Sequence, residues 1–189
     1  MFLLISIPLG LVLGLLLGGR LDRLGQVRFA WAPLALAGLL VQVALFTPLG
    51  GQVAGGWEPA IYVASTAAVF LALARNLRLT GLPIAAVGAL SNLAAIVANG
   101  GAMPTDSGAL SAAGLSGPGT DTNSVVLANP ALQPLTDIVA IPAGVPFANV
   151  FSVGDVLIGL GVAIAIAAAM RAKTATTRGA PAAGSPPRT

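Results

Sequence analysis

The chain of 189 residues contains neither cysteine nor histidine. Without a thiol it can form no disulfide and no thiolate nucleophile, and without an imidazole it lacks the commonest general base near neutral pH. The usual ligand sets of zinc sites are missing for the same reason. Any chemistry must therefore come from carboxylates, hydroxyls, amides or the backbone, and we expect neither a metal nor a cofactor.

Charged residues are also rare in this sequence. Only 8% of the residues are charged whereas 56% are hydrophobic, and the mean hydropathy is +0.92. In a soluble domain about a quarter of the residues are charged, so a buried core cannot account for this composition. We therefore expect an integral protein of the cell membrane whose main partner is the lipid bilayer.

Five apolar stretches have roughly the length that a helix needs to cross the ~30 Å hydrocarbon core of a bilayer. We expect an all-α, polytopic membrane fold in which residues 1–171 form one domain and 172–189 form a disordered cytoplasmic tail. The tail is predicted from its Ala, Pro, Gly, Ser and Thr composition. The predicted spans cover about residues 2–19, 30–49, 59–74, 82–98 and 150–170.

The basic residues predict the orientation of these spans. All nine lie in three short clusters beside apolar runs. With the N-terminus outside and the C-terminus in the cytoplasm, the loops 20–29 and 75–81 and the end of the chain from 171 are cytoplasmic and hold every one of them, as the positive-inside rule requires. No aromatic residues interleave with these clusters, so we expect no nucleic-acid partner.

The segment 99–149 is predicted to lie outside the membrane. Asn99-Gly-Gly-Ala-Met-Pro104 ends the fourth span through two glycines and a proline. Residues 129–146 are apolar but contain four prolines, so they cannot form a spanning helix. We expect them either to lie along the outer membrane surface or to fold back onto the tops of the helices.

Two kinds of small or polar residue inside the spans suggest helix packing. Gly10, Gly14 and Gly18 recur at a spacing of four and leave one face of the first span as bare backbone, which suits close packing in lipid. Ser91 and Asn92 in the fourth span are expected to form hydrogen bonds between helices.

The acidic residues are candidates for function. Asp155 lies at the start of the fifth span, where an ionisable group is costly and is a functional candidate by default. It also fits a capping box, with Ser152 as the N-cap and Asp155 at the third helical position. Asp137 lies in the outer segment and could equally be a solvated surface acid.

Two resemblances follow from these stretches. Asn-Gly-Gly-Ala-Met-Pro and Phe-Ser-x-Gly-Asp-x-x-Ile-x-x-Gly resemble an uncharacterised family of bacterial multi-pass membrane proteins. In addition, three stretches resemble those of lipoprotein signal peptidases, which are membrane aspartyl proteases. The three stretches are Asn99-Gly-Gly101-Ala-Met-Pro104, Leu135-Thr-Asp137-Ile138 and Phe151-Ser152-Val-Gly-Asp155-Val-Leu-Ile158-Gly-Leu-Gly161.

The second resemblance implies an activity. Asp137 and Asp155 would be the catalytic pair, and Asn99, Gly101 and Ser152 would contact a lipid-linked or membrane peptide substrate at the outer leaflet. Two neighbouring carboxylates share one proton, so that one activates water and the other donates to the scissile carbonyl. The chain departs from the peptidases in placing loop, not further spans, between Asn99 and Asp137.

We expect a structural or accessory membrane subunit of unassigned activity, with the aspartyl hydrolase as the alternative and a transporter or channel as a third function. A hydrolase requires Asp137 and Asp155 to converge and the pKa of at least one of them to be raised. A structural or accessory subunit, bound to other membrane proteins, requires only that Asp155 cap its helix and that Asp137 face water. A transporter or channel has less support, because few polar groups are available to line a pathway and no inverted repeat is evident.

Overall fold

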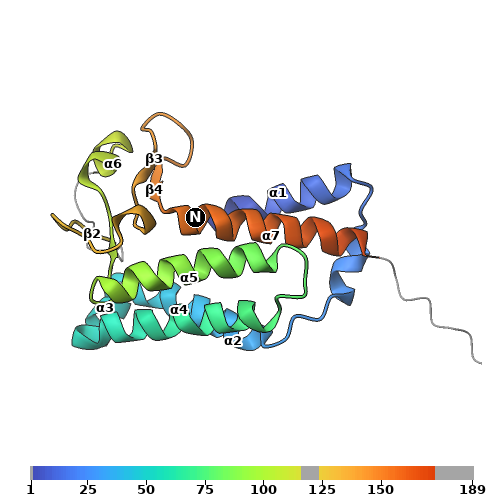
Figure 1. Cartoon of the computed structure of the whole chain (residues 1–189), viewed down its shortest axis with the longest axis horizontal. Coiled ribbons are helices and arrows are strands. Elements are labelled where there is room, and N and C mark those ends of the chain that lie inside the picture. Colours follow the sequence, from blue (N-terminus) through green and yellow to red (C-terminus); the bar gives the residue numbers. More distant parts are fainter. Residues whose placement is uncertain (1, 116–123, 173–189) are drawn as a thin grey trace, which may run out of the picture.

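The structure, a computed structural model, describes residues 2–115 and 124–172. Its body consists of five longer helices that lie side by side (Figure 1), and the order across the bundle is α1, α7, α5, α4, α2. These helices are α1 (Phe2–Leu16), α2 (Ala32–Leu45), α4 (Glu58–Arg75), α5 (Leu82–Ala98) and α7 (Val153–Arg171). The tail predicted to be disordered lies outside the described residues except for Ala172.

The helix bounds agree with the predicted spans to different degrees. The prediction of 82–98 for the fourth helix is confirmed, and α4 extends the predicted 59–74 by one residue at each end. The second span ends early at Leu45, because Phe46 and Thr47 break the helix and Thr47 caps the short α3 (Pro48–Ala54). The one-turn helix η2 (Gly55–Trp57) then leads into α4.

Among the described residues, two helical stretches are long and apolar enough to cross a membrane. They are Pro48–Arg75, with 28 residues and a hydropathy of 1.4, and Val153–Arg171, with 19 residues and a hydropathy of 2.2. Ile5–Leu16, Ala32–Leu45 and Leu82–Ala98 are apolar but shorter. Length and composition thus single out the stretch through α4 and α7 as the two strongest candidates.

Small residues allow α7 to approach its two neighbours closely. A Cβ on Gly10 would lie 2.8 Å from the Ala163 carbonyl oxygen, and one on Gly14 would overlap the Met170 side chain. These two glycines of α1 therefore face α7, as their spacing predicts. Gly18 has no neighbour within 4 Å and instead ends the helical stretch with a φ of +76°.

The interface between α5 and α7 is equally tight. A Cβ on Gly88 would lie 2.5 Å from the Gly154 carbonyl oxygen, and one on Gly161 would lie 2.4 Å from the Ala85 backbone nitrogen. The two backbones are therefore in near contact at two levels along the bundle. This proximity brings the start of α7 directly beside the second half of α5.

The segment 99–149, called the outer segment below, contains short β-strands. The expectation of an all-α fold is therefore corrected for this part of the chain. Two short pairs of strands form in it. Strand β1 (Met103–Pro104) pairs in parallel with β2 (Ser124–Val125), and β3 (Val139–Ile141) pairs antiparallel with β4 (Asn149–Phe151). Prolines and glycines lie within or beside these strands and disfavour a helix at those positions, so the backbone there satisfies its polar groups by strand pairing.

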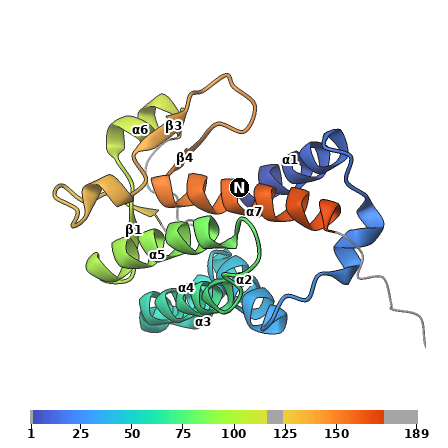
Figure 2. The same ribbon diagram turned by 45° about the vertical axis from the view of Figure 1, so that its right-hand side comes forward.

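The proline-rich stretch 129–146 folds back onto the helix tops, which was one of its two predicted positions. Its one-turn helix η3 (Gln133–Leu135) packs against α5 and α7, and Leu135 contacts the core cluster around Ile96. The loop after β3 is joined to the short helix α6 (Ser107–Ala112) by a hydrogen bond of 2.9 Å from Ala143 N to Ala112 O. Figure 2 shows this small layer against one end of the bundle.

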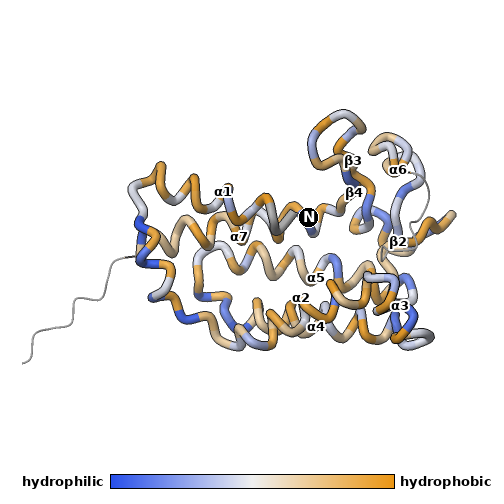
Figure 3. Tube along the Cα trace, turned by 180° about the vertical axis from the view of Figure 1, so that it is seen from behind, coloured by the Kyte–Doolittle hydropathy of each residue, from blue (hydrophilic) through white to orange (hydrophobic). Residues whose placement is uncertain are grey.

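The opposite end of the bundle carries the arginines of the described residues. The loop between α1 and α2 contains the 3₁₀-helix η1 (Leu21–Gln26), and Asn76 clamps this loop through hydrogen bonds with Ala30 N and O at 2.8 and 2.7 Å. Hydrophilic residues are concentrated at this end in Figure 3, whereas the helices between the two ends are mainly hydrophobic. The arginines at this end are Arg20, Arg23, Arg28, Arg75, Arg78 and Arg171.

Candidate functional site

Asp155 caps the helix to which it belongs. The Ser152 hydroxyl accepts a hydrogen bond from Asp155 N at 3.0 Å, and Asp155 Oδ2 accepts one from Ser152 N at 3.2 Å. This reciprocal pair is the predicted capping box, which is confirmed. It satisfies two backbone donors at the start of α7 and fixes the orientation of the Asp155 carboxylate.

Asn92 of α5 ties the same carboxylate to the neighbouring helix. Its amide nitrogen donates to Asp155 Oδ1 at 2.8 Å, and its amide oxygen accepts from the Ser152 hydroxyl at 2.9 Å. The expected hydrogen bonding between helices is confirmed for Asn92. Both Asp155 oxygens therefore accept hydrogen bonds within the protein.

Backbone pairing places Asp137 beside the end of α5. Asp137 N donates to Pro104 O at 3.0 Å, and Asp106 N donates to Asp137 O at 3.0 Å, so that Thr105 and Asp137 form a parallel bridge. Thr105 is buried, and Asp137 is partly buried. The Asn-Gly-Gly-Ala-Met-Pro turn thus ends directly beside the acid that follows it by more than thirty residues.

Burial, together with the negative charge of Asp155, raises the pKa of Asp137 to about 7, while the nearby Thr105 hydroxyl acts in the opposite direction. Within the described part of the chain, neither Asp137 Oδ1 nor the Thr105 hydroxyl completes a hydrogen bond, although both atoms are buried. Asp137 is therefore not a simple solvated surface acid. It is half protonated near neutral pH and carries an unused oxygen.

The other predicted substrate-binding residues hold the outer segment in place. The Asn99 amide exchanges two hydrogen bonds with Ala131, from Ala131 N at 2.8 Å and to Ala131 O at 2.9 Å, and also donates to Ala95 O at 2.8 Å. Gly101 has a φ of +90°, and a Cβ there would lie 2.5 Å from the Pro59 Cβ. Their contact with a substrate, and that of Ser152, stays a prediction.

Thr105 is the residue of this site that sequence reasoning missed. It follows Pro104 without any charge or motif of its own, and only the strand pairing brings it to Asp137. Among the described residues, no group of three or more acidic, histidine or cysteine side chains is placed to hold a metal ion. A carboxyl group with a raised pKa, such as that of Asp137, can transfer a proton to or from a bound molecule.

A family model matches residues 26–167, which is most of the chain and includes every residue of this site. The chain belongs to this family of unknown function, DUF5317. No curated protein and no solved structure shows a significant match to it. The match begins at Gln26 and ends at Ala167, so it covers α2, α4, α5, the segment 99–149 and most of α7.

Asn92 and Ser91 provide a matched pair of mutations in this family member. Asn92→Ala is expected to lower the free energy of unfolding by ~1–3 kcal/mol, because Asp155 Oδ1 and the Ser152 hydroxyl both lose a partner in a partly buried place. Ser91→Ala should change stability by less than ~0.5 kcal/mol or stabilise the fold, since the buried Ser91 hydroxyl has no partner in the described structure. Equilibrium unfolding in mixed micelles measures the free energy of unfolding of both variants. Equal losses in the two variants would contradict the role of Asn92 as the hydrogen-bond partner of Asp155 and Ser152.

Proposed function

We propose that the protein is a five-span membrane protein with its N-terminus outside and its C-terminus in the cytoplasm. The support is the arrangement of the helices around α7, the more apolar of the two helical stretches that are long enough to cross a membrane. Because α1 and α5 pack along opposite sides of α7, and α4 and α2 follow in the same row, a bilayer that contains α7 also surrounds its neighbours. The sequences of α1, α2 and α5 contain no charged residue.

The outward faces of the bundle suit a lipid environment. Large apolar side chains are exposed on every helix of the row, whereas a monomeric soluble protein exposes only limited apolar patches. Exposed examples include Leu9 and Val12 on α1, Leu36, Leu40 and Val43 on α2, Leu71 on α4, Val87 and Leu90 on α5 and Leu160 on α7. The helix α2, with 14 residues, rises only ~21 Å. A local thinning of the bilayer accommodates such a short span at modest cost.

Within this membrane frame, we propose that Asp137 and Asp155 act as the acid pair of an aspartyl hydrolase at the outer end of the bundle. The observation that carries this proposal is the raised pKa of Asp137, to which the charge of Asp155 contributes. A carboxyl group that is half protonated at neutral pH beside a carboxylate held by hydrogen bonds is the division of roles that this chemistry needs.

The mechanism assigns one role to each acid. Asp155, which accepts hydrogen bonds from Asn92 and Ser152, takes a proton from a water molecule as the water oxygen attacks the scissile carbonyl carbon. Protonated Asp137 donates its proton to the carbonyl oxygen, which yields a neutral tetrahedral intermediate. One hydroxyl group of the intermediate then returns its proton to Asp137 as the carbonyl re-forms. Protonated Asp155 donates its proton to the leaving nitrogen or oxygen, so that the amide or ester bond breaks and both acids regain their starting states. Neither Asp137 Oδ1 nor the Thr105 hydroxyl has a hydrogen-bond partner in the described structure, so both keep hydrogen-bonding capacity for a substrate that enters the site.

A second candidate function has one observation in its favour. Both Asp155 oxygens are engaged in hydrogen bonds within the protein, which is what a purely structural cap would show. In that case the chain is a structural or accessory membrane subunit, and Asp137 is a buried acid without a reaction. The two functions predict different results for Asp137→Asn and Asp155→Asn. Turnover falls in both variants if the protein is a hydrolase, and neither substitution changes turnover if it is an accessory subunit.

The decisive experiment measures turnover in proteoliposomes with acyl-anchored, quenched fluorescent peptides. We expect Asp137→Asn and Asp155→Asn each to lower turnover at least ~100-fold, because each removes one partner of the proton transfer. Asparagine can still accept the capping hydrogen bond, so α7 should remain folded. Asp106→Asn is the matched control: it is an exposed outer acid that caps α6, and asparagine retains that cap.

Unchanged turnover in both variants would leave the accessory-subunit interpretation in place. If Asp106→Asn lowers turnover by as much as the other two variants, the loss would instead indicate a general effect of negative charge in the outer segment. A peptide that carries a hydroxyl group in place of the scissile carbonyl should bind the wild-type protein and lose affinity in the Asp137 and Asp155 variants. The hydroxyl-bearing peptide mimics the tetrahedral intermediate, so its binding tests the site even if none of the substrate peptides is cleaved.

A further inference from the structure

A groove of about 420 Å³ lies at the arginine-rich end of the bundle, far from the acid pair. It is bounded by η1, by the loop between α4 and α5, and by the last turns of α7. Its lining is apolar, with Leu24, Phe29, Leu79 and Ile166 among its walls, except for Arg78 and Thr80. Its volume falls within the ~300–1,000 Å³ that is typical of ligand pockets.

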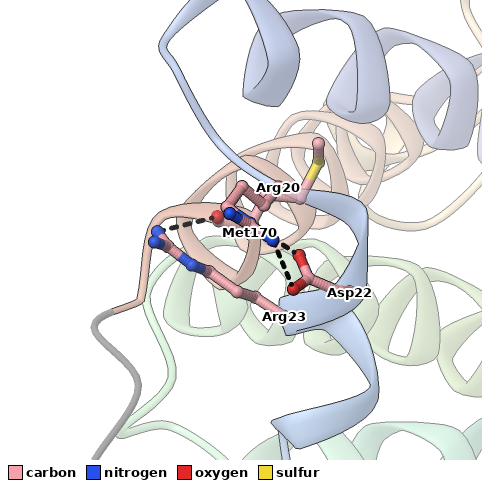
Figure 4. Close-up of polar contacts among 4 residues, drawn as sticks. All are labelled: Arg20, Asp22, Arg23 and Met170. Atoms are coloured by element: carbon pink, nitrogen blue, oxygen red, sulfur yellow. Dashed lines mark hydrogen bonds and ion pairs between the residues drawn. The ribbon is translucent and has the colours of Figure 1, made fainter.

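The wall formed by η1 is fixed to the end of α7. Arg20 N donates to Met170 O at 2.8 Å, and the Arg23 guanidinium reaches the same carbonyl oxygen at 3.5 Å. Figure 4 shows both arginines around the exposed end of the helix, where the helix dipole favours a positive charge. The groove is therefore a built feature between anchored elements and not a space beside a free loop.

The charge around the groove is strongly unbalanced. The described residues at this end include six arginines and one acid, Asp22, which gives a net charge of +5. Asp22 is already paired with Arg20 at 3.1 Å. In the described structure Arg78, the arginine that lines the groove, has no carboxylate partner and is exposed.

We propose that the groove holds one acyl chain of an anionic phospholipid of the cytoplasmic leaflet, with the lipid phosphate against Arg78. This inference rests on the proposed membrane orientation. An apolar slot beside an unpaired arginine at the membrane boundary matches a molecule with an apolar chain and an anionic head, and basic pockets between spans are known to hold such headgroups. A small soluble anion would leave the apolar walls unused.

The test uses the full chain in phosphatidylcholine nanodiscs doped with phosphatidylglycerol. Native mass spectrometry after release into detergent should show phosphatidylglycerol retained in preference to phosphatidylcholine. Arg78→Gln should weaken this retention about fivefold, the effect of one arginine at an anionic surface. Arg75→Gln is the matched control, since it removes the same charge from the last turn of α4 without lining the groove.

Filling the groove provides an independent test of the acyl-chain site. Ala169→Trp should weaken retention about tenfold, as expected if roughly two methylene groups lose their burial. Leu79→Trp is the substitute if that variant fails to fold. Equal losses in Arg75→Gln and Arg78→Gln, or no loss on filling the groove, would overturn the site. So would glycerol phosphate binding as well as the lipid, because that would indicate a soluble anion.

The outcome of these lipid measurements can be told apart from the outcome for the proposed hydrolase activity. A nanodisc presents the same lipids to both ends of the bundle, so selective retention does not depend on which end faces the cytoplasm. Turnover of peptides at Asp137 and Asp155 is measured separately at the other end. Arg78→Gln could lose lipid selectivity and still cleave the peptides as fast as the wild-type protein. That result would therefore support the lipid site alone.

Discussion

Replacing Asp137 with asparagine is expected to stabilise the protein at pH 8 by up to ~4 kcal/mol and to leave its stability nearly unchanged at pH 4. The pKa of Asp137 is about 7 in the folded chain, against an ordinary value of ~3.9. Because the folded value is raised, the favourable contribution of the protonated acid is fully present below pH ~4 and is lost as the pH rises through about 7. Asparagine resembles the protonated acid and does not titrate.

The measurement is the free energy of unfolding as a function of pH in mixed micelles. Wild-type stability should fall between pH 4 and pH 7, and the fall should be much smaller in Asp137→Asn. Asp155→Asn removes the negative charge that helps to raise the folded-state pKa of Asp137, so the fall should still begin near pH ~4 but should be smaller and end at a lower pH. Parallel pH curves for wild type and Asp137→Asn would contradict a buried, titrating Asp137.

This cost in stability bears on function. By keeping a partly buried acid with an unused oxygen at position 137, the chain is less stable at pH 8 by up to ~4 kcal/mol than it would be with asparagine there. Strongly shifted pKa values are concentrated at functional sites, although structural networks can also produce them. The hydrogen bonds of Asp155 explain why that acid is tolerated, whereas no hydrogen bond in the described structure explains Asp137. Asp137 is accordingly the stronger of the two indications of an active site.

The sequence predicts those features that depend on neighbours along one helix. The capping box at Ser152 and Asp155 follows from a spacing of three, and the contact of Gly10 and Gly14 with α7 follows from a spacing of four. The bounds of α5 follow from a mainly apolar run without charged residues that ends at Asn99-Gly-Gly. In each case the signal is local, so no knowledge of the rest of the fold is needed.

The strand pairs and the position of Thr105 could not be predicted in the same way. Strands of two or three residues contain too few positions for an alternating pattern, and their partners lie elsewhere in the chain. The bridge between Thr105 and Asp137 joins residues 32 positions apart through backbone groups, which every residue possesses. The shifted pKa of Asp137 depends on that bridge, and so it becomes visible only in the structure.

Single cysteines are expected to divide into three classes according to the proposed five-span topology. The natural chain has no cysteine, so each introduced thiol reports one position only. Val53→Cys, at an 80% exposed site on α3, should react with a membrane-impermeant maleimide added to intact cells. Leu77→Cys, at a 47% exposed site between α4 and α5, should react only after the cells are opened. Val87→Cys, 59% exposed in the middle of α5, should resist the reagent in both cases.

The third class separates a membrane bundle from a soluble one. In a soluble protein the exposed position 87 would react as fast as the loops, because exposure to water is all that the reagent needs. In a bilayer the same surface is covered by hydrocarbon, where a thiol neither ionises nor meets the reagent. Detergent denaturation should then restore labelling at position 87, which controls for a thiol that is merely unreactive. Reversal of the first two classes would keep the five spans but place the arginine-rich end outside, against the positive-inside rule.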